Sequence, residues 1–340
     1  MSQHKQDSYY RRVFFISLLA FAGISFVLFY LYLYPSWAFF DTDANSVLPE
    51  QSMIDLRENL EQHVYVLAEE IGERHFQDPT ALIASIDYIR KRFADSGYNP
   101  GHHTFGGGPY HNIVAELHGH GNLHEVLVIG AHYDTVWHSP GADDNASGVA
   151  ALLEIARLLS NESHQRTLRF ITFANEEQPF AEGDEMGSQV YVRSLKETND
   201  SVVAMFSLEM LGYYSDEKGS QRYPFPLNWI YPDRGFFIGF ISNLKSTALL
   251  LRSLHHFRRA ATFPVQGLAV PEKLVPDIRR SDHASFWDAG IPALMITDTA
   301  NFRNRYYHSI GDTPETLDYD SMTRVVAGLV SMLRSLANPR

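Results

Sequence analysis

The chain has 340 residues, and its proportions of hydrophobic residues (45%) and charged residues (20%) are typical of a folded globular protein. The formal net charge of −12 argues against nucleic-acid binding, because phosphate backbones are bound by basic surfaces. The absence of cysteine excludes disulfides, thiolate nucleophiles and cysteine-based metal sites. Any metal ion bound by this sequence is therefore held by histidines and carboxylates.

Near the N-terminus, residues 13–34 form a run of 22 residues without a charged side chain. A helix of this length extends for roughly 33 Å, which is enough to cross the hydrocarbon core of a bilayer. The run is longer than the apolar region of a cleaved signal peptide, and it ends in tyrosines followed by Trp37, which are typical of the membrane interface. We therefore expect residues 13–34 to be an uncleaved transmembrane anchor.

The charges on either side of this run predict its orientation. The basic residues before it are Lys5, Arg11 and Arg12, and the first acidic residues after it are Asp41, Asp43 and Glu50. The positive-inside rule then places residues 1–12 in the cytoplasm and the rest of the chain on the extracytoplasmic side. We expect a single-pass membrane protein in which residues 35–50 link the anchor to a folded domain over residues 51–340.

From residue 51 onward, helical segments alternate with short β-rich runs. Apolar residues recur at helical spacing in the segments 51–75, 80–96, 148–160, 187–195 and 317–336. The β-rich runs are 112–117, 126–131, 168–174, 202–208, 236–241 and 293–297. This alternation predicts an α/β domain in which helices cover both faces of a mixed, mostly parallel sheet.

In sheets of this class, ligands bind beyond the carboxyl ends of the strands. Functional side chains are therefore expected just after residues 131, 174, 208 and 297. The aromatic and proline-rich stretch 214–235 lies between two of the predicted strands, and loops of this length often form lids or pocket walls.

The first of these strand ends is followed by His132-Tyr133-Asp134. A surface histidine beside an acidic turn would look the same, but the pair also suits a metal site. His132 would bind a cation through one ring nitrogen, and Asp134 would fix the ring or its surroundings. Further along, Asp143 and Asp144 stand among small residues in PGADDNASG, before a predicted helix. Helix capping does not require two adjacent aspartates, so we favour a carboxylate packed between two cations.

Two glutamates, Glu176 and Glu177, follow the predicted strand 168–174. They fit an exposed acidic turn equally well, but if buried they need neighbouring cations. In that case one glutamate can bind metal while the other transfers protons. Glu209 after strand 202–208, and His308 near the C-terminus, are ambiguous alone. Together, these histidines and carboxylates stand largely where strand ends are expected to place ligands.

Six motifs in this order resemble the family of co-catalytic zinc aminopeptidases. They are GAHYDT, PGADDNASG, NEE, LEM, SDHASFWDAGIPA and YYHSIGDTPETLD, and the resemblance covers roughly residues 112–320. The same family includes glutamate carboxypeptidases, glutaminyl cyclases and the inactive ectodomain of the transferrin receptor. The resemblance implies a three-layer α/β/α sandwich and two zinc ions, with cobalt or manganese as possible substitutes.

The resemblance also assigns roles to individual residues. Five are metal ligands: His132 and Glu209 on one zinc ion, Glu177 and His308 on the other, and Asp144 bridging both. Glu176 would be the general base, and Asp134 would support the ligands. Some members of the family use a tyrosine just upstream of the SDH motif to hold the oxyanion, but here Arg279 and Arg280 stand in that neighbourhood. These arginines could replace the tyrosine, recognise an acidic substrate or be surface residues.

The resemblance therefore implies a two-zinc exopeptidase, most simply an aminopeptidase that hydrolyses peptides outside the cytoplasm. Glutaminyl cyclisation and an inactive receptor-type ectodomain are the alternatives. The second alternative is disfavoured because all five ligand positions and the base are present. The sequence does not define the residue preference or the oligomeric state.

Overall fold

The computed structural model describes residues 11–25, 48–106, 110–121, 124–225 and 227–339. The domain is built on one eight-stranded sheet with the strand order β1-β2-β4-β3-β5-β8-β6-β7. The strands are β1 Gly101–Thr104, β2 His111–Leu117, β3 Glu125–His132, β4 Thr167–Phe173, β5 Ser201–Glu209, β6 Ile238–Ser242, β7 Val265–Ala269 and β8 Ala293–Thr297.

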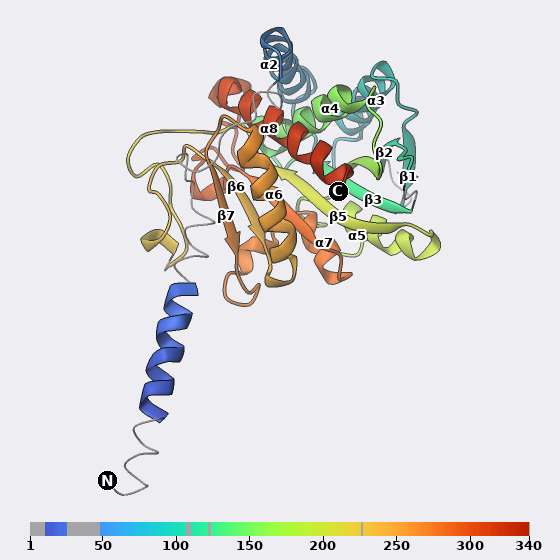
Figure 1. Ribbon diagram of the computed structural model, residues 1–340. Helices are drawn as coiled ribbons and strands as arrows, with labels where there is room; N and C mark the ends of the chain where they lie inside the picture. The colour runs from blue at the N-terminus through green and yellow to red at the C-terminus, as the bar shows by residue number, and fades with distance from the viewer. Residues whose placement is uncertain (1–10, 26–47, 107–109, 122–123, 226, 340) are drawn as a thin grey trace, which may run out of the picture.

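Helices cover the sheet on both sides (Figure 1). They are α2 Glu50–Tyr65, α3 Pro79–Asp95, α4 Gly148–Leu159, α5 Gly187–Ser194, α6 Thr247–Ala260, α7 His283–Asp288 and α8 Tyr319–Ala337. The larger core joins α2, α3, α4, α6 and α8 to one face of the sheet, whereas α5 and α7 pack on the opposite face. The α/β sandwich expected from the sequence is therefore observed.

The register of the sheet brings the functional strand ends together. Strands β4, β3, β5 and β8 are neighbours and run parallel to one another, so that their carboxyl ends lie at one edge. Strand β2 is antiparallel to β4, and β6 is antiparallel to β8, which makes the sheet mixed. Side chains alternate between the two cores along β3, where Ile129 faces the larger core and Val128 the smaller one.

Strands β1 and β7 are not among the β-rich runs of the sequence. The short β1 is largely exposed and contains His102 and His103, which read as a polar loop. Strand β7 has the sequence VQGLA, in which glutamine and glycine interrupt the apolar run. Both strands occur at the ends of the sheet order, where each pairs with one neighbour only.

The predicted anchor is described in part. Residues 11–25 are helical, whereas residues 26–34 of the anchor and most of the predicted linker lie outside the described residues. Within the parts of the chain that the structure describes, no helix combines the length and apolar character needed to cross a bilayer.

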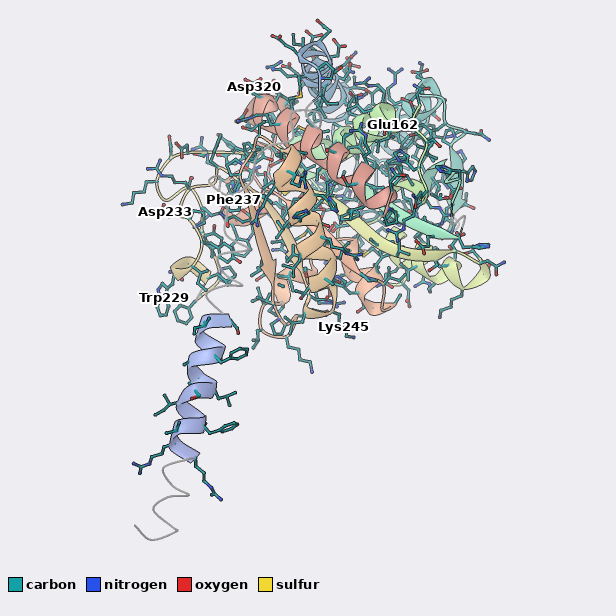
Figure 2. All side chains as sticks on the ribbon, viewed as in Figure 1. Glu162, Trp229, Asp233, Phe237, Lys245 and Asp320 are labelled. Carbon is teal, nitrogen blue, oxygen red and sulfur yellow. The ribbon has the colours of Figure 1, made fainter. Side chains whose placement is uncertain are left out.

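The segment 214–235 forms a pocket wall, as the sequence predicts. Tyr223, Leu227 and Tyr231 line a cavity beside the sheet. Trp229 projects from the domain at the tip of the segment (Figure 2) and is 75% exposed.

Candidate metal centre

The predicted ligands converge at the carboxyl edge of the sheet. His132 and Glu209 are the last residues of β3 and β5. Glu177 follows β4, Asp144 lies in the turn before α4, and His308 lies in the loop after β8. These residues come from separate parts of the sequence, and the parallel strand order brings them together. Asp144, Glu177, Glu209 and His308 line one cleft, and His132 is buried behind them.

Asp144 lies between the two histidines. Its Oδ1 is 3.2 Å from Nε2 of His132, and its Oδ2 is 3.1 Å from Nε2 of His308. Glu209 Oε2 lies 3.4 Å from His132 Nε2, and Glu177 Oε1 lies 3.2 Å from His308 Nε2. Each oxygen of Asp144 thus faces a different histidine, and each histidine has a glutamate nearby. Glu177 also lies close enough to His132 and Asp144 to share one metal ion with them.

These spacings fit metal coordination. Ligands about 2.0–2.1 Å from a tetrahedral zinc ion are separated from one another by about 3.3 Å. His132 Nε2 and Asp144 Oδ1 are buried and have no hydrogen-bond partner among the described residues, so a cation would satisfy both. Glu176 also approaches His132 Nε2, at 3.9 Å, and belongs to a possible metal-binding group with His132 and Glu209. We keep Glu176 apart from the ligands because it is farther from this nitrogen than Asp144 or Glu209.

Burial and mutual repulsion disfavour ionised carboxylates in this cluster. Burial raises the pKa of Glu177 to about 7, with a further contribution from Asp144. Burial, together with Glu209 and Glu177, holds the pKa of Glu176 well above its ordinary value. Although burial opposes it, contacts with Asp144 and Glu177 raise the pKa of His308 to about 10. In the absence of metal, the site therefore retains protons that a divalent cation would replace.

Asp134 supports the cluster in two ways. Its backbone carbonyl lies 3.1 Å from Nδ1 of His132, which leaves Nε2 directed at Asp144 and Glu209. Its carboxylate accepts hydrogen bonds from the backbone N–H groups of Glu176 and Glu177, at 3.1 and 3.0 Å. Asp134 therefore orients both the histidine and the glutamate pair.

Other supporting residues were not singled out in the sequence. Asp312 accepts hydrogen bonds from the backbone N–H groups of Asp143 and Asp144, at 2.9 and 3.1 Å, and it stands inside the last motif, YYHSIGDTPETLD. Ser281, in the SDH motif, donates a hydrogen bond of 2.8 Å to Glu209. No pattern in the sequence around Arg74 predicts a role for it. It is nevertheless fully buried, and it donates hydrogen bonds to the turn that contains Asp144.

The backbone is strained beside three of the site residues. Asn175, which precedes Glu176, has φ 59°, Met210 after Glu209 has φ 54°, and His308 itself has φ 56°. Residues other than glycine rarely adopt such values, and where they do they often serve a functional geometry.

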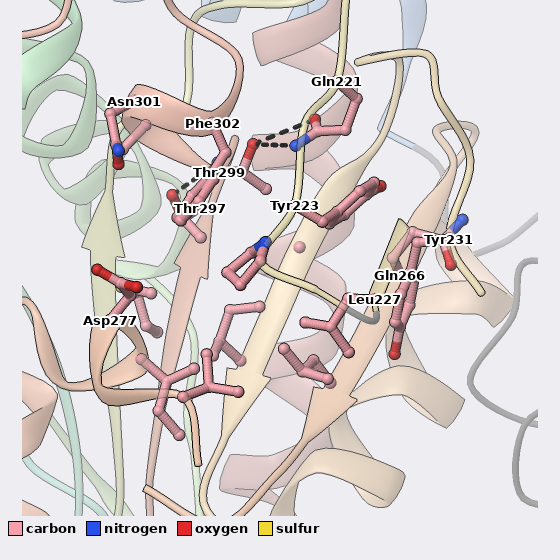
Figure 3. Close-up of a pocket in the computed structure, with 18 of the residues that line it drawn as sticks. Gln221, Tyr223, Leu227, Tyr231, Gln266, Asp277, Thr297, Thr299, Asn301 and Phe302 are labelled. Atoms are coloured by element: carbon pink, nitrogen blue, oxygen red, sulfur yellow. Dashed lines mark hydrogen bonds between the residues drawn. The ribbon is translucent and has the colours of Figure 1, made fainter. Parts of the chain in front are cut away.

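Two cavities meet at the cluster. A polar cleft of about 1030 Å³, including its mouth, is lined by Asp144, Glu176 and Glu177. An adjoining pocket of about 870 Å³, measured in the same way, has walls built largely from aromatic and aliphatic side chains (Figure 3). Three residues line both cavities: Glu209, Arg280 and Tyr307.

The two arginines left open by the sequence have different positions. Arg279 lines the polar cleft, but it pairs with Glu272 and lies 2.8 Å from Asp288, so its charge is neutralised by these two carboxylates. Arg280 borders both cavities and donates a hydrogen bond of 3.1 Å to the hydroxyl of Tyr307. The ring of Tyr307 stacks on that of His308, with centroids 3.7 Å apart. Tyr307 directly precedes this candidate ligand in the sequence, and that position was a signal by which it could have been found.

A mixed α/β sheet with histidines and carboxylates grouped at its carboxyl edge is the arrangement of a metal-dependent hydrolase. The model of Peptidase family M28 matches residues 112–333. Uncharacterized protein YfbL of Escherichia coli K12 is 37% identical over 320 residues, which cover 91% of this chain and 97% of that protein. The chain therefore belongs to peptidase family M28, and the resemblance to the co-catalytic zinc peptidases is confirmed. It is a zinc-dependent metalloexopeptidase.

Solved structures share the fold. BSAP, a zinc aminopeptidase from Bacillus subtilis, is similar with a TM-score of 0.65 at 15% identity, covering 84% of this chain and 95% of that one. A glutaminyl cyclase from Bacteroides thetaiotaomicron is similar with a TM-score of 0.62 at 17% identity, covering 82% and 97%. Peptidase relatives from fungi and Streptomyces are 26–28% identical, and the chain spans little more than half of their length.

Proposed function

We propose that the protein is a two-zinc aminopeptidase that acts on peptides outside the cytoplasm. The observation that carries the proposal is the position of Asp144, whose two oxygens face two separate histidine–glutamate groups. A single ion would need only one of these groups. His132 and Glu209 would hold one zinc ion, Glu177 and His308 the other, and Asp144 both.

Zinc bound here would supply Lewis-acid activation of water and of the scissile carbonyl. Glu176 is placed to move the proton, because it lines the cleft and its N–H is held by Asp134. Its carboxylate would take a proton from the attacking water and pass it to the leaving amine. Tyr307 and Arg280 border the same cleft and would donate hydrogen bonds to the developing oxyanion, in place of the missing upstream tyrosine.

The cavities favour removal of a residue from the amino end. Glu209 lies where the apolar pocket joins the polar cleft. A substrate whose first side chain enters the pocket would bring its free ammonium group to Glu209 and the other carboxylates of the cleft.

Metal content and activity test the proposal together. The purified full chain should bind two equivalents of zinc and release free amino acids from aminoacyl-anilides. Chelation should abolish turnover, and zinc, or cobalt or manganese, should restore it. A stoichiometry of one, with ammonia released from a peptide carrying N-terminal glutamine and no cleavage, would instead establish a glutaminyl cyclase. A folded protein that binds no zinc would support the receptor-type alternative.

We also propose that residues 13–34 anchor the chain, with residues 1–12 in the cytoplasm. The uncharged run and the flanking charges support this orientation. Protease added to intact cells or spheroplasts should then degrade the folded domain while leaving cytoplasmic markers intact. Recovery of the full chain in the supernatant after membrane sedimentation would contradict the anchor.

A further inference from the structure

Gln266 is a buried polar residue in the wall of the apolar pocket. It lies on β7, is 4% exposed and lines the cavity. Its side-chain Oε1 is buried and has no hydrogen-bond partner among the described residues. An amide in this state is unfavourable unless a ligand supplies the missing partner.

The neighbouring polar groups of the pocket are already engaged. The amide of Gln221 exchanges hydrogen bonds with Thr299, at 2.9 and 3.1 Å (Figure 3). The hydroxyl of Tyr231 donates to the carbonyl of Gly267 at 2.6 Å, and that of Tyr223 donates to the carbonyl of Pro232 at 2.9 Å. The two tyrosines therefore direct their hydroxyls at the backbone and offer their rings to the cavity.

Gln266 lies away from the metal centre. In Figure 3, it is beside Tyr231 at one end of the pocket, whereas Asp277 is at the other end. Asp277 in turn lies 3.7 Å from Arg280, which borders the metal cleft. Opposite Gln266 on β6 stands Gly239, whose lack of a side chain leaves room beside the amide. A substrate side chain that enters from the cleft thus passes apolar side chains of the pocket before it reaches Gln266.

We propose that Gln266 is a specificity-determining residue and that the pocket selects an N-terminal tyrosine. The inference rests on the proposed aminopeptidase function and names its substrate class. The aromatic ring of tyrosine matches the apolar walls, and its hydroxyl both donates and accepts hydrogen bonds. It can therefore pair with the amide of Gln266 in either orientation of the oxygen and nitrogen. Phenylalanine fills the same walls but leaves the amide without a partner.

The test compares kcat/KM for tyrosyl- and phenylalanyl-p-nitroanilide in the zinc-loaded full chain. A site that hydrogen-bonds a substrate hydroxyl discriminates more strongly than an apolar pocket does. We expect the native protein to favour tyrosine by about tenfold or more. In Gln266→Leu the ratio should fall to about one, with turnover of the phenylalanyl substrate retained; Gln266→Met provides a second apolar replacement of similar length. A native ratio of one or less, or a ratio unchanged in both variants, would overturn the proposal.

Binding separates this proposal from the proposed function. If the protein hydrolyses no aminoacyl-anilide, the aminopeptidase assignment fails, and calorimetry with L-tyrosine amide and L-phenylalanine amide still tests the pocket. Tighter binding of the tyrosine amide, lost in Gln266→Leu, supports the role of Gln266. Equal binding of the two amides refutes it.

Discussion

Replacement of Arg74 should show how strongly the metal centre depends on a buried cation. Arg74 is fully buried, and its guanidinium contacts five backbone carbonyls at hydrogen-bond distance, three of which share the two N–H groups of Nη1. The acceptors in the turn leading to Asp144 are Pro140 and Gly141, at 2.7 and 2.8 Å. Tyr133, next to His132, accepts at 2.8 Å. The Arg74 side chain thus joins the backbone next to His132 to the turn that precedes Asp144.

Arg74→Lys keeps the charge but offers at most three donors from a single nitrogen. At least two of the five contacts with carbonyls are then lost, although the carbonyls of Leu67 and Gly141 each keep a backbone N–H donor. A hydrogen bond from a charged donor contributes about 1.5–3 kcal/mol, so the free energy of unfolding should fall by about 3–6 kcal/mol. This loss is a large part of the stability of about 5–15 kcal/mol that is usual for a folded domain. Because the turn also positions Asp144, zinc affinity should fall by about 10–100-fold.

Denaturant unfolding and competitive zinc titration of the purified full chain measure the two effects. Arg193→Lys is a matched control, because Arg193 is largely exposed and pairs with the fully exposed Asp184. It should change the free energy of unfolding by less than about 0.5 kcal/mol. If Arg74→Lys behaved like this control in both measurements, the argument that Arg74 holds the ligand-bearing turn would be refuted.

Three further predictions concern the cluster itself. Glu176→Gln should retain both metals but lower kcat by about 10²–10⁴-fold, as loss of a proton-transfer group does; near-normal turnover would remove that role. Ser281→Ala should lower the zinc affinity of the site that contains Glu209 by about 10–100-fold in a stepwise titration, because Glu209 loses its hydroxyl donor. The site that contains Glu177 should keep its affinity, and equal weakening of both sites would argue against the ligand grouping. At His308 and Glu177 the folded, metal-free protein binds more protons than the unfolded chain, because the pKa of His308 is raised to about 10 and that of Glu177 to about 7. Six histidines have a lowered pKa and act in the opposite direction only below about pH 7. Stability should therefore fall between about pH 7 and 9 while zinc affinity rises, and a denaturation midpoint that increased over this range would contradict the shifts.

The positions of four of the five candidate ligands could be predicted because each follows a recognisable pattern, whereas His308 was indicated only by its family motif. His132, Glu177 and Glu209 come at or just after apolar β-rich runs, and parallel strands bring their carboxyl ends to one edge. The family motifs then distinguished these residues from ordinary polar turns. Asp144 was indicated by its small neighbours, which fit the tight turn seen before α4.

The residues that sequence reasoning missed act through contacts far apart in the chain. Arg74 bonds to carbonyls 59–67 residues away, so its role has no local periodicity. Gln266 interrupts an apolar run, so the sequence did not predict β7. Its proposed role depends on a pocket wall contributed by the segment 214–235. Tyr307 was visible in its motif, but only the stacked geometry on His308 places its hydroxyl next to Arg280.

Glu209 connects specificity with chemistry in this arrangement. It is a candidate ligand at the end of β5, it is held by Ser281, and it lines both the polar cleft and the apolar pocket. In the proposed function, a side chain seated in the pocket would therefore fix the position of the adjacent scissile bond relative to Glu176 and the candidate zinc ligands. Binding of the first side chain in the pocket would then orient the scissile carbonyl, although the two are far apart. A first residue that fits the pocket poorly should therefore lower kcat as well as raise KM.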